Sequence, residues 1–188
     1  MGRRRTIDRD QVLELAERIV AERGAAALTI DAVATAAGIS KGGVQSCFGT
    51  KEAMISAMLD RWIQEYEACL SAALERRDGS LAARLDAHLD LSLGEGAESS
   101  ARAAALVAAL LHNPEHLCSV RGWYAERFEG LFQAGDPGRP LRLALLATEG
   151  AVLLRHFGLA ALSDAEWNTI RADIKALVMS GEGTRRPE

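Results

Sequence analysis

The chain has 188 residues, of which 48% are apolar, 26% are charged and four are proline. This composition excludes a disordered or fibrous protein, and no apolar run approaches the roughly 18 residues needed to cross a bilayer. The net charge of −4 argues against a protein that coats nucleic acid. The length fits two unequal domains, and we expect them at residues 1–50 and 51–188.

Positive charge is concentrated at the N-terminus. Residues 1–51 carry eight Lys or Arg against six Asp or Glu, a net charge of +2, and residues 52–188 carry fourteen against twenty, a net charge of −6. A tail containing Arg4 and Arg5 can follow a phosphate backbone or enter a minor groove, although a solvated tail that only aids solubility has the same composition. No apolar signal region follows it, so we expect a cytoplasmic protein.

The three cysteines, Cys47, Cys69 and Cys118, are far apart and include no CxxC pair. This spacing indicates neither a zinc site nor a redox motif, and we expect each thiol to be a small buried hydrophobic group. No cofactor motif is present either.

Helical periodicity dominates the sequence, and no stretch alternates long enough to be a strand, so the expected fold is all-α with about nine helices. The first helix is expected near residues 8–23 and is stopped by Gly24. Thr29 and Ser40 are good N-caps for two short helices, ending near Ala37 and Phe48, and Gly38 permits a sharp turn between them.

Longer helices follow in the rest of the chain. Thr50 is expected to cap a helix that runs to Arg77, and Ser80 to begin another that closes at Gly94. A sixth helix should end before Pro114, which opens a seventh that reaches Ala134. After a Gly- and Pro-rich loop, the eighth spans about 140–158, and Ser163 with Glu166 forms a capping box for the ninth, which should fray after Ser180.

Two short helices joined by a Gly-containing turn form a helix-turn-helix pattern, and packing against the preceding helix makes a three-helix DNA-binding module. The second helix of the pair would then enter the major groove. Its exposed Gln45 and Ser46 can read base edges, and the glycines at 42 and 43 let backbone approach phosphate.

The segments AERGAAAL (21–28), TIDAVATAAGIS (29–40) and KGGVQSCFGTKEAM (41–54) resemble the TetR family of transcriptional repressors, and the match covers about residues 7–60. The resemblance implies a homodimer with N-terminal domains on successive major grooves of a palindromic operator. It also implies C-terminal helices that form an effector cavity and the dimer interface. By resemblance, Thr29, Lys41 and Lys51 contact phosphates, and Gly43, Gln45 and Ser46 face bases or backbone.

The recognition helix departs from the family pattern, which commonly has tyrosine at the position of Gln45 and an aromatic residue or histidine near Ser46 and Cys47. The operator of this chain is therefore not expected to copy that of relatives. Thr29 and Lys51 also have plainer readings, as a helix cap and a solvated lysine.

The last two helices are the expected dimer interface, as a two-fold four-helix arrangement, with simple core packing as the alternative. The residues expected there are Leu145, Val152, Trp167, Ile170 and Ile174. A mainly apolar cavity is expected between the long helix and the helices after it, which favours a lipophilic or aromatic effector. We expect this effector to release the repressor from DNA by favouring a conformation whose DNA-binding domains are wrongly spaced. The candidate walls of the cavity are Trp62, Tyr66, Leu89, Leu110, Trp123, Phe128 and His156.

Two other classes of protein fit parts of the sequence. Residues 112–116 spell H-x-x-E-H, a metalloprotease string, but Pro114 opposes the continuous helix that would align both imidazoles. We therefore expect no enzyme, no catalytic residue and no metal. A helical ligand-binding protein that has lost DNA binding is the stronger rival, because the recognition helix is atypical.

Overall fold

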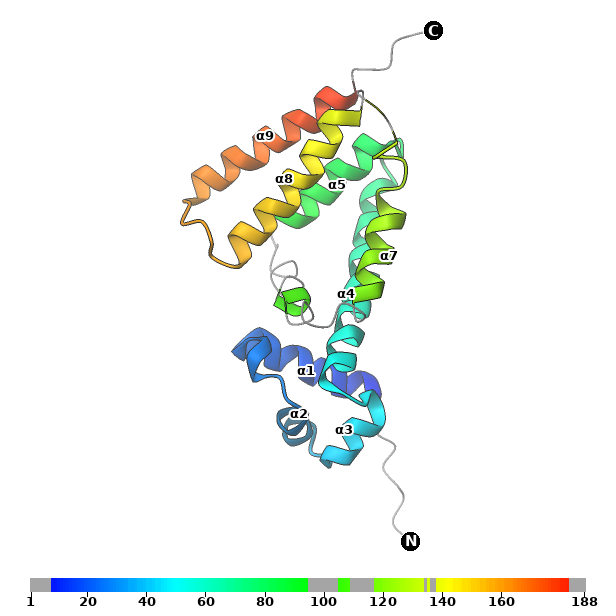
Figure 1. The fold of residues 1–188 in the computed structure, drawn as a ribbon, viewed down its shortest axis with the longest axis vertical. Helices are drawn as coiled ribbons and strands as arrows, with labels where there is room; N and C mark the ends of the chain where they lie inside the picture. The colour runs from blue at the N-terminus through cyan, green and yellow to red at the C-terminus, as the bar shows by residue number, and fades with distance from the viewer. Residues whose placement is uncertain (1–7, 95–104, 109–116, 134, 136–137, 183–188) are drawn as a thin grey trace. The chain divides into compact units, whose positions relative to one another are not determined.

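A computed structural model describes residues 8–94, 105–108, 117–133, 135 and 138–182. These residues form helices and connecting turns, and none of them lies in a strand (Figure 1), so the predicted all-α class is confirmed. The chain divides into two compact units, of which the N-terminal unit holds residues 1–62 and 105–121. The C-terminal unit holds residues 63–104 and 122–188.

The N-terminal unit contains α1 (Arg9–Arg23), the 3-10 turn η1 (Ala25–Ala27), α2 (Ile30–Ala37), α3 (Lys41–Phe48) and the first part of α4 (Lys51–Leu74). The ends of α1, α2 and α3 agree with the prediction, whereas η1 was not expected from the sequence. The Thr29 hydroxyl accepts a hydrogen bond from the backbone N–H of Ala32, and the Ser40 hydroxyl accepts one from Gly43. Between α2 and α3, Gly38 has a φ of 63°, the left-handed conformation that favours glycine.

One hydrophobic core holds the N-terminal unit together. It consists of apolar side chains from α1, α2, α3 and the start of α4, and Leu106 from the segment 105–108 is buried in the same core. Arg61 of α4 pairs with Glu14 and Glu17 of α1, at 3.6 and 3.8 Å. The two short helices therefore pack against α1 and α4, because two helices of this length cannot bury enough apolar surface by themselves.

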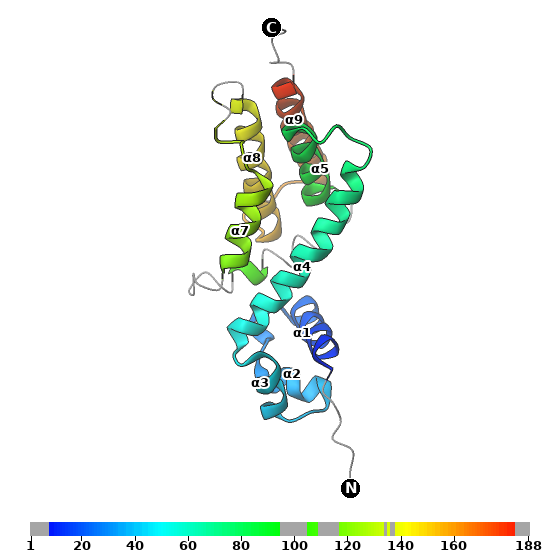
Figure 2. The same ribbon diagram turned by 90° about the vertical axis from the view of Figure 1, so that its right-hand side faces the viewer.

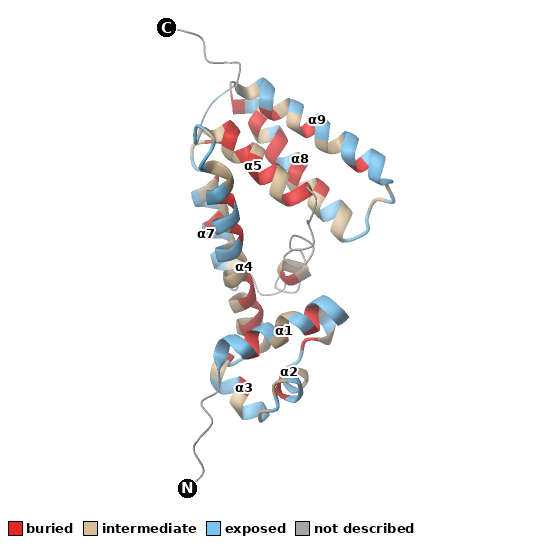
Figure 3. Ribbon diagram, turned by 180° about the vertical axis from the view of Figure 1, so that it is seen from behind, coloured by how far each residue is buried: buried red, intermediate tan, exposed pale blue. Residues whose placement is uncertain are grey.

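The C-terminal unit is built around α5 (Leu81–Leu93), α8 (Arg139–His156) and α9 (Asp164–Glu182), which pack against one another (Figures 1 and 2). It is completed by α4 from residue 63 onward and by the part of α7 (Cys118–Arg127) from residue 122 onward. Figure 3 shows burial concentrated on α5 and on one side of α8, whereas much of α9 is exposed. The Ser163–Glu166 capping box of α9 is confirmed, with Ser163 N–H donating to Glu166 at 2.7 Å and Glu166 N–H donating to the Ser163 hydroxyl at 3.3 Å.

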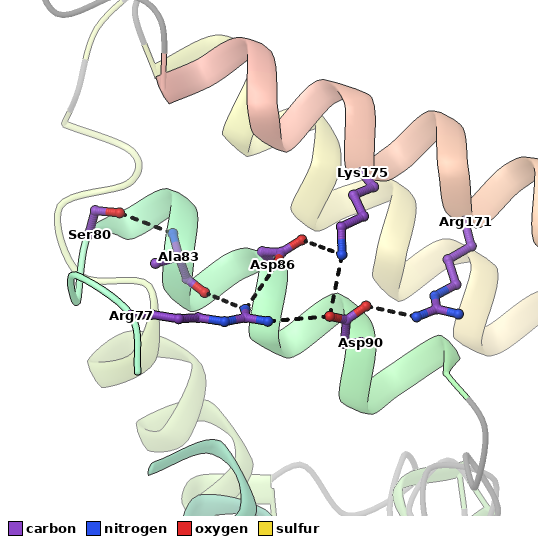
Figure 4. Close-up of polar contacts among 7 residues, drawn as sticks. All are labelled: Arg77, Ser80, Ala83, Asp86, Asp90, Arg171 and Lys175. Atoms are coloured by element: carbon purple, nitrogen blue, oxygen red, sulfur yellow. Dashed lines mark hydrogen bonds and ion pairs between the residues drawn. The ribbon is translucent and has the colours of Figure 1, made fainter. Parts of the chain in front are cut away.

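A cluster of ion pairs joins α5 to α9 (Figure 4), and we call its members, Arg77, Asp86, Asp90, Arg171 and Lys175, the α5–α9 ion cluster. Arg77 lies 2.9 Å from Asp86 and 3.4 Å from Asp90. Arg171 approaches the other oxygen of Asp90 at 2.8 Å, and Lys175 lies 3.2 Å from Asp86. Two carboxylates of one helix thus hold two cations of another.

Three sequence predictions are wrong in detail. The long helix ends at Leu74 rather than Arg77, and α7 ends at Arg127 rather than Ala134, because the chain turns through Gly130, whose φ is 81°. Cys69 and Cys118 are exposed rather than buried, and Cys47 is half-buried. Among the described residues, no helix is long and apolar enough to span a bilayer.

Candidate functional site

Helix α3 presents a short polar face to solvent. Val44 and Phe48 are buried in the N-terminal core, and Cys47 is half-buried, so the helix is fixed by one side. Lys41, Gly42, Gln45 and Ser46 are exposed on the other side. Arg9 of α1 secures the end of the helix, because its guanidinium lies 4.7 Å from the centre of the Phe48 ring and donates to the Cys47 carbonyl at 3.5 Å.

The three predicted phosphate-contact residues lie around this face with different partners. Lys41 forms an ion pair with Asp31 of α2 at 2.9 Å. Lys51, in the first turn of α4, donates to the Ala25 carbonyl at 3.4 Å and is half-buried. Thr29 is exposed and uses its hydroxyl oxygen as the N-cap acceptor of α2, which leaves its O–H available as a donor.

Several predicted site residues fall outside the described residues. These are Arg4 and Arg5 of the tail, Leu110 of the effector walls, and the string His112–His116. In the described part of the chain, no three His, Cys, Asp or Glu side chains gather as metal ligands would.

In the C-terminal unit, buried and half-buried aromatic rings from α4, α5 and α7 meet. Tyr66 of α4 and Trp123 of α7 lie edge to face with ring centres 5.5 Å apart, and Phe128, just after α7, lies 5.3 Å from the His88 ring of α5. Tyr124 stacks edge-on against Trp123 at 4.8 Å. The structure thus brings together three predicted effector residues, Tyr66, Trp123 and Phe128. We call these three rings, together with those of His88 and Tyr124, the aromatic cluster.

A chain of hydrogen bonds runs through the aromatic cluster. His88 Nε2 lies 2.8 Å from Glu149 of α8, and because a carboxylate only accepts, this nitrogen donates. The Tyr66 hydroxyl lies 2.6 Å from Nδ1 of the same ring. Tyr124 donates to the second Glu149 oxygen at 2.7 Å. Burial raises the pKa of both phenols, and the Glu149 charge raises that of Tyr124 further, so both stay protonated donors.

A second carboxylate, that of Glu67, contacts the aromatic rings at Trp123. Glu67 accepts from the Trp123 indole N–H and pairs with Arg127 of α7. Neither Glu67 nor Glu149 was predicted from the sequence, because both look like ordinary exposed helix residues there. The four-residue spacing of Trp62 and Tyr66 indicated a face of α4, but periodicity gives no information about which distant helix brings a carboxylate to that face.

The other predicted effector residues in the described part of the chain are Leu89, His156 and Trp62. Leu89 is fully buried in α5. His156 lies near the end of α8, where burial and then the charge of Arg155 lower its pKa. Trp62 belongs to the N-terminal unit.

The predicted dimer residues divide between two environments. Leu145, Trp167 and Ile174 are buried inside the C-terminal unit, whereas Val152 and Ile170 are half-buried. The exposed apolar side chains of α8 are different ones, namely Leu143, Leu146, Leu153 and Leu154, followed by Phe157 just after the helix.

Two family models match the chain. The model described as bacterial regulatory proteins, tetR family, covers residues 12–58, and the model of the tetracyclin repressor-like C-terminal domain covers residues 82–179, more than half of the sequence. The chain belongs to the TetR family. It is therefore a transcriptional regulator and not an enzyme, and the partners of a TetR-family regulator are operator DNA, a small-molecule ligand and a second copy of itself.

Solved structures confirm the TetR fold over nearly the whole length. A transcriptional regulator from Rhodococcus sp. Rha1 has a TM-score of 0.69 and 21% identity, covering 96% of this chain and 100% of that one. The multidrug binding protein EbrR, complexed with ethidium, has a TM-score of 0.66 and 22% identity, covering 90% and 98%. The fatty acid degradation regulator FadR from Bacillus halodurans has a TM-score of 0.60 and 16% identity, covering 99% and 100%. No curated protein sequence matches the chain.

Proposed function

We propose that this TetR-family regulator is a homodimeric repressor that binds a palindromic operator and is released by a small lipophilic effector. Residues 1–50 act as the DNA-binding domain and residues 51–188 as the effector and dimerisation domain. The protein works in the cytoplasm, where its operator is accessible. The observation that carries the proposal is the polar face of α3, which a buried three-helix core holds toward solvent with Gln45 and Ser46 exposed.

On DNA, phosphate contacts are assigned to Thr29, Lys41 and Lys51, with Arg4 and Arg5 added from the tail. Gly43, Gln45 and Ser46 face the bases or the adjoining backbone. Lys51 supports this assignment because a cation in the first turn of a helix is electrostatically unfavourable, whereas an anion at that position is favourable. A DNA phosphate bound beside Lys51 would offset this unfavourable interaction with the helix by a favourable ion pair.

The dimer interface is assigned to α8 and α9. Leu143, Leu146, Gly150, Leu153 and Phe157 recur at intervals of three and four residues, the spacing of a helix–helix seam, and we call them the outer stripe of α8. Leu146 is 62% exposed in the single chain, and all four large side chains of the stripe point away from the core. Leu145, Trp167 and Ile174 support the interface from beneath, and Val152 and Ile170 lie at its border.

The effector site is assigned to the aromatic cluster, with Tyr66, Trp123 and Phe128 as its centre and with Leu89 and His156 on the adjoining helices. Flat apolar ligands pack well against edge-to-face rings. The side chains of Glu67 and Glu149 remain 31% and 28% exposed, so a ligand at the rings meets partly open carboxylates. The ethidium bound to the structural relative EbrR has this chemistry, being flat, aromatic and cationic.

The DNA part of the proposal is tested by selecting random duplexes with the purified protein at moderate salt. We expect an inverted repeat whose half-sites lie about one helical turn or more apart. Lys51→Ala should then weaken all selected sites alike and reduce the salt slope by about one, whereas the exposed Arg76→Ala should change neither. Binding without any sequence preference would favour a ligand-binding protein that has lost its operator.

The effector part is tested with ethidium and the protein alone, since ethidium also binds DNA. We expect ethidium to raise the melting temperature of the wild-type protein by mass action. The increase should be lost in Trp123→Phe and kept in Trp167→Phe, which alters the α8–α9 contact instead. An equal increase in both variants would place the ligand elsewhere.

A further inference from the structure

The face that α3 offers to DNA carries one side chain with a planar hydrogen-bonding group. Lys41 is engaged by Asp31, Ser46 has a single short hydroxyl, and Gly42 has no side chain. The side-chain amide of Gln45 is exposed and makes no hydrogen bond within the described part of the chain. Among the residues of α3, Gln45 is thus the group able to form two directed hydrogen bonds to one base.

The chemistry of an amide selects one base in the major groove. A glutamine offers one acceptor and one donor side by side, which match the N6 amino group and the N7 acceptor of adenine. Guanine presents two acceptors, N7 and O6, so one of them would face the amide oxygen. The same two acceptors suit the two N–H donors of an arginine.

Gly42 gives this short side chain the approach it needs. Glycine destabilises a helix relative to alanine, yet Gly42 has no positive φ, and a Cβ added there would have only the Ser40 hydroxyl oxygen within 4 Å, at 4.0 Å. The N-terminal unit therefore has room for a side chain at this position. Gly42 also lies three residues before Gln45, on the same stretch of helix surface.

We propose that Gln45 reads an adenine in each operator half-site through a bidentate major-groove contact. We also propose that the absence of a side chain at Gly42 lets the Gln45 amide approach that base. This inference rests on the proposed repressor function. It assigns a base preference to the position at which this chain departs from the aromatic residue common in its family.

The test is a second duplex selection with variants at position 45. Wild-type protein should select an A·T pair that Gln45→Arg changes to G·C at the same place. In Gln45→Ala, the preference for A·T over the other base pairs at that position should fall by about 10- to 100-fold. The base preferences at the other operator positions should not change. The exposed Arg76→Ala, outside the DNA-binding helices, should leave the A·T preference intact.

Gly42→Ala tests the clearance separately. We expect this variant to melt at or above the wild-type temperature while its affinity for the selected site falls about 10-fold or more. The matched control is Gly122→Ala, an exposed helical glycine of α7 whose added Cβ would meet nothing within 4 Å. It should keep wild-type affinity for DNA.

These experiments distinguish a failure of this inference from a failure of the proposed repressor function. If the wild-type protein enriches no sequence, the repressor function itself fails. If it enriches an inverted repeat whose selected bases are unchanged in Gln45→Arg, the repressor stands and the assignment to adenine is overturned. If Gly42→Ala binds as tightly as the wild type, Gly42 has no role in clearance.

Discussion

His88 is 3% exposed and connects side chains from three other helices. Its ring nitrogens meet Tyr66 of α4 and Glu149 of α8, and its edges pack against the rings of Trp123 and Phe128. A buried polar group is tolerated only while its partners remain, so each member of this chain depends on the others.

Replacing His88 should therefore be costly. We expect His88→Ala to lower the free energy of unfolding by about 2–4 kcal/mol, because it leaves a cavity and removes the imidazole hydrogen bonds to Tyr66 and Glu149. Tyr124→Phe removes one hydrogen bond and keeps the ring, so it should cost only about 1 kcal/mol. Urea unfolding of both variants measures the difference, and equal losses would contradict the proposed importance of His88.

The titration of His156 makes the free energy of unfolding depend on pH. Its pKa in the folded protein is lowered by burial and by the charge of Arg155, so the unfolded chain binds a proton more readily. Stability is then fully present above the unfolded value of about 6.5 and is lost as the pH falls below it. Urea unfolding between pH 8 and pH 5 should show a smaller loss for His156→Gln than for the wild type, and parallel curves would refute this.

At the scale of single elements, local signals in the sequence were enough to place most helix ends. Thr29, Ser40 and Ser163 cap helices in the structure as predicted, since a cap depends only on residues two or three positions away. The end of α7 differs from the predicted one because the chain turns at Gly130, whose φ is positive. The partners of Glu67, Glu149 and Asp90 could not be predicted, because each lies on a helix distant in sequence.

The α5–α9 ion cluster leads to an acid-dependent prediction. Burial alone would raise the pKa of Asp90, but hydrogen bonds and charge from Arg171 and Lys175 outweigh it and hold the pKa below its ordinary value. A carboxyl group whose pKa is lowered by folding stabilises the protein above the unfolded value of about 3.9, and this stability is lost as the pH falls through the folded value.

Asp90→Asn should accordingly lower the free energy of unfolding by about 1–2 kcal/mol at neutral pH and flatten its loss in acid. Thermal unfolding from pH 7 to pH 3 measures both effects. Asp173→Asn is the control, since Asp173 is exposed on α9, the helix that carries Arg171 and Lys175, and the variant should behave as the wild type. A full acid-dependent loss in Asp90→Asn would assign that loss to other carboxylates.

At the scale of the whole molecule, the outer stripe of α8 predicts the oligomeric state. Leu146→Arg places a charge in the centre of the proposed seam and should weaken dimerisation by about 10-fold or more without lowering helix content. Sedimentation across a concentration series measures this. Ala72→Arg, at an exposed position of α4, is the control. A dimer unaffected by Leu146→Arg would exclude this face of α8 as the interface.

The segment 105–121 folds with the N-terminal unit, with Leu106 fully buried in its core and Leu117 and Val120 packed against that core. The module that presents α3 is therefore discontinuous in sequence. In a chimaera that transfers only the first sixty or so residues to a relative, a side chain of the relative would occupy the position of Leu106 in this core. Exchange of DNA specificity between relatives should succeed more often when both segments are transferred together, or when α3 alone is rewritten.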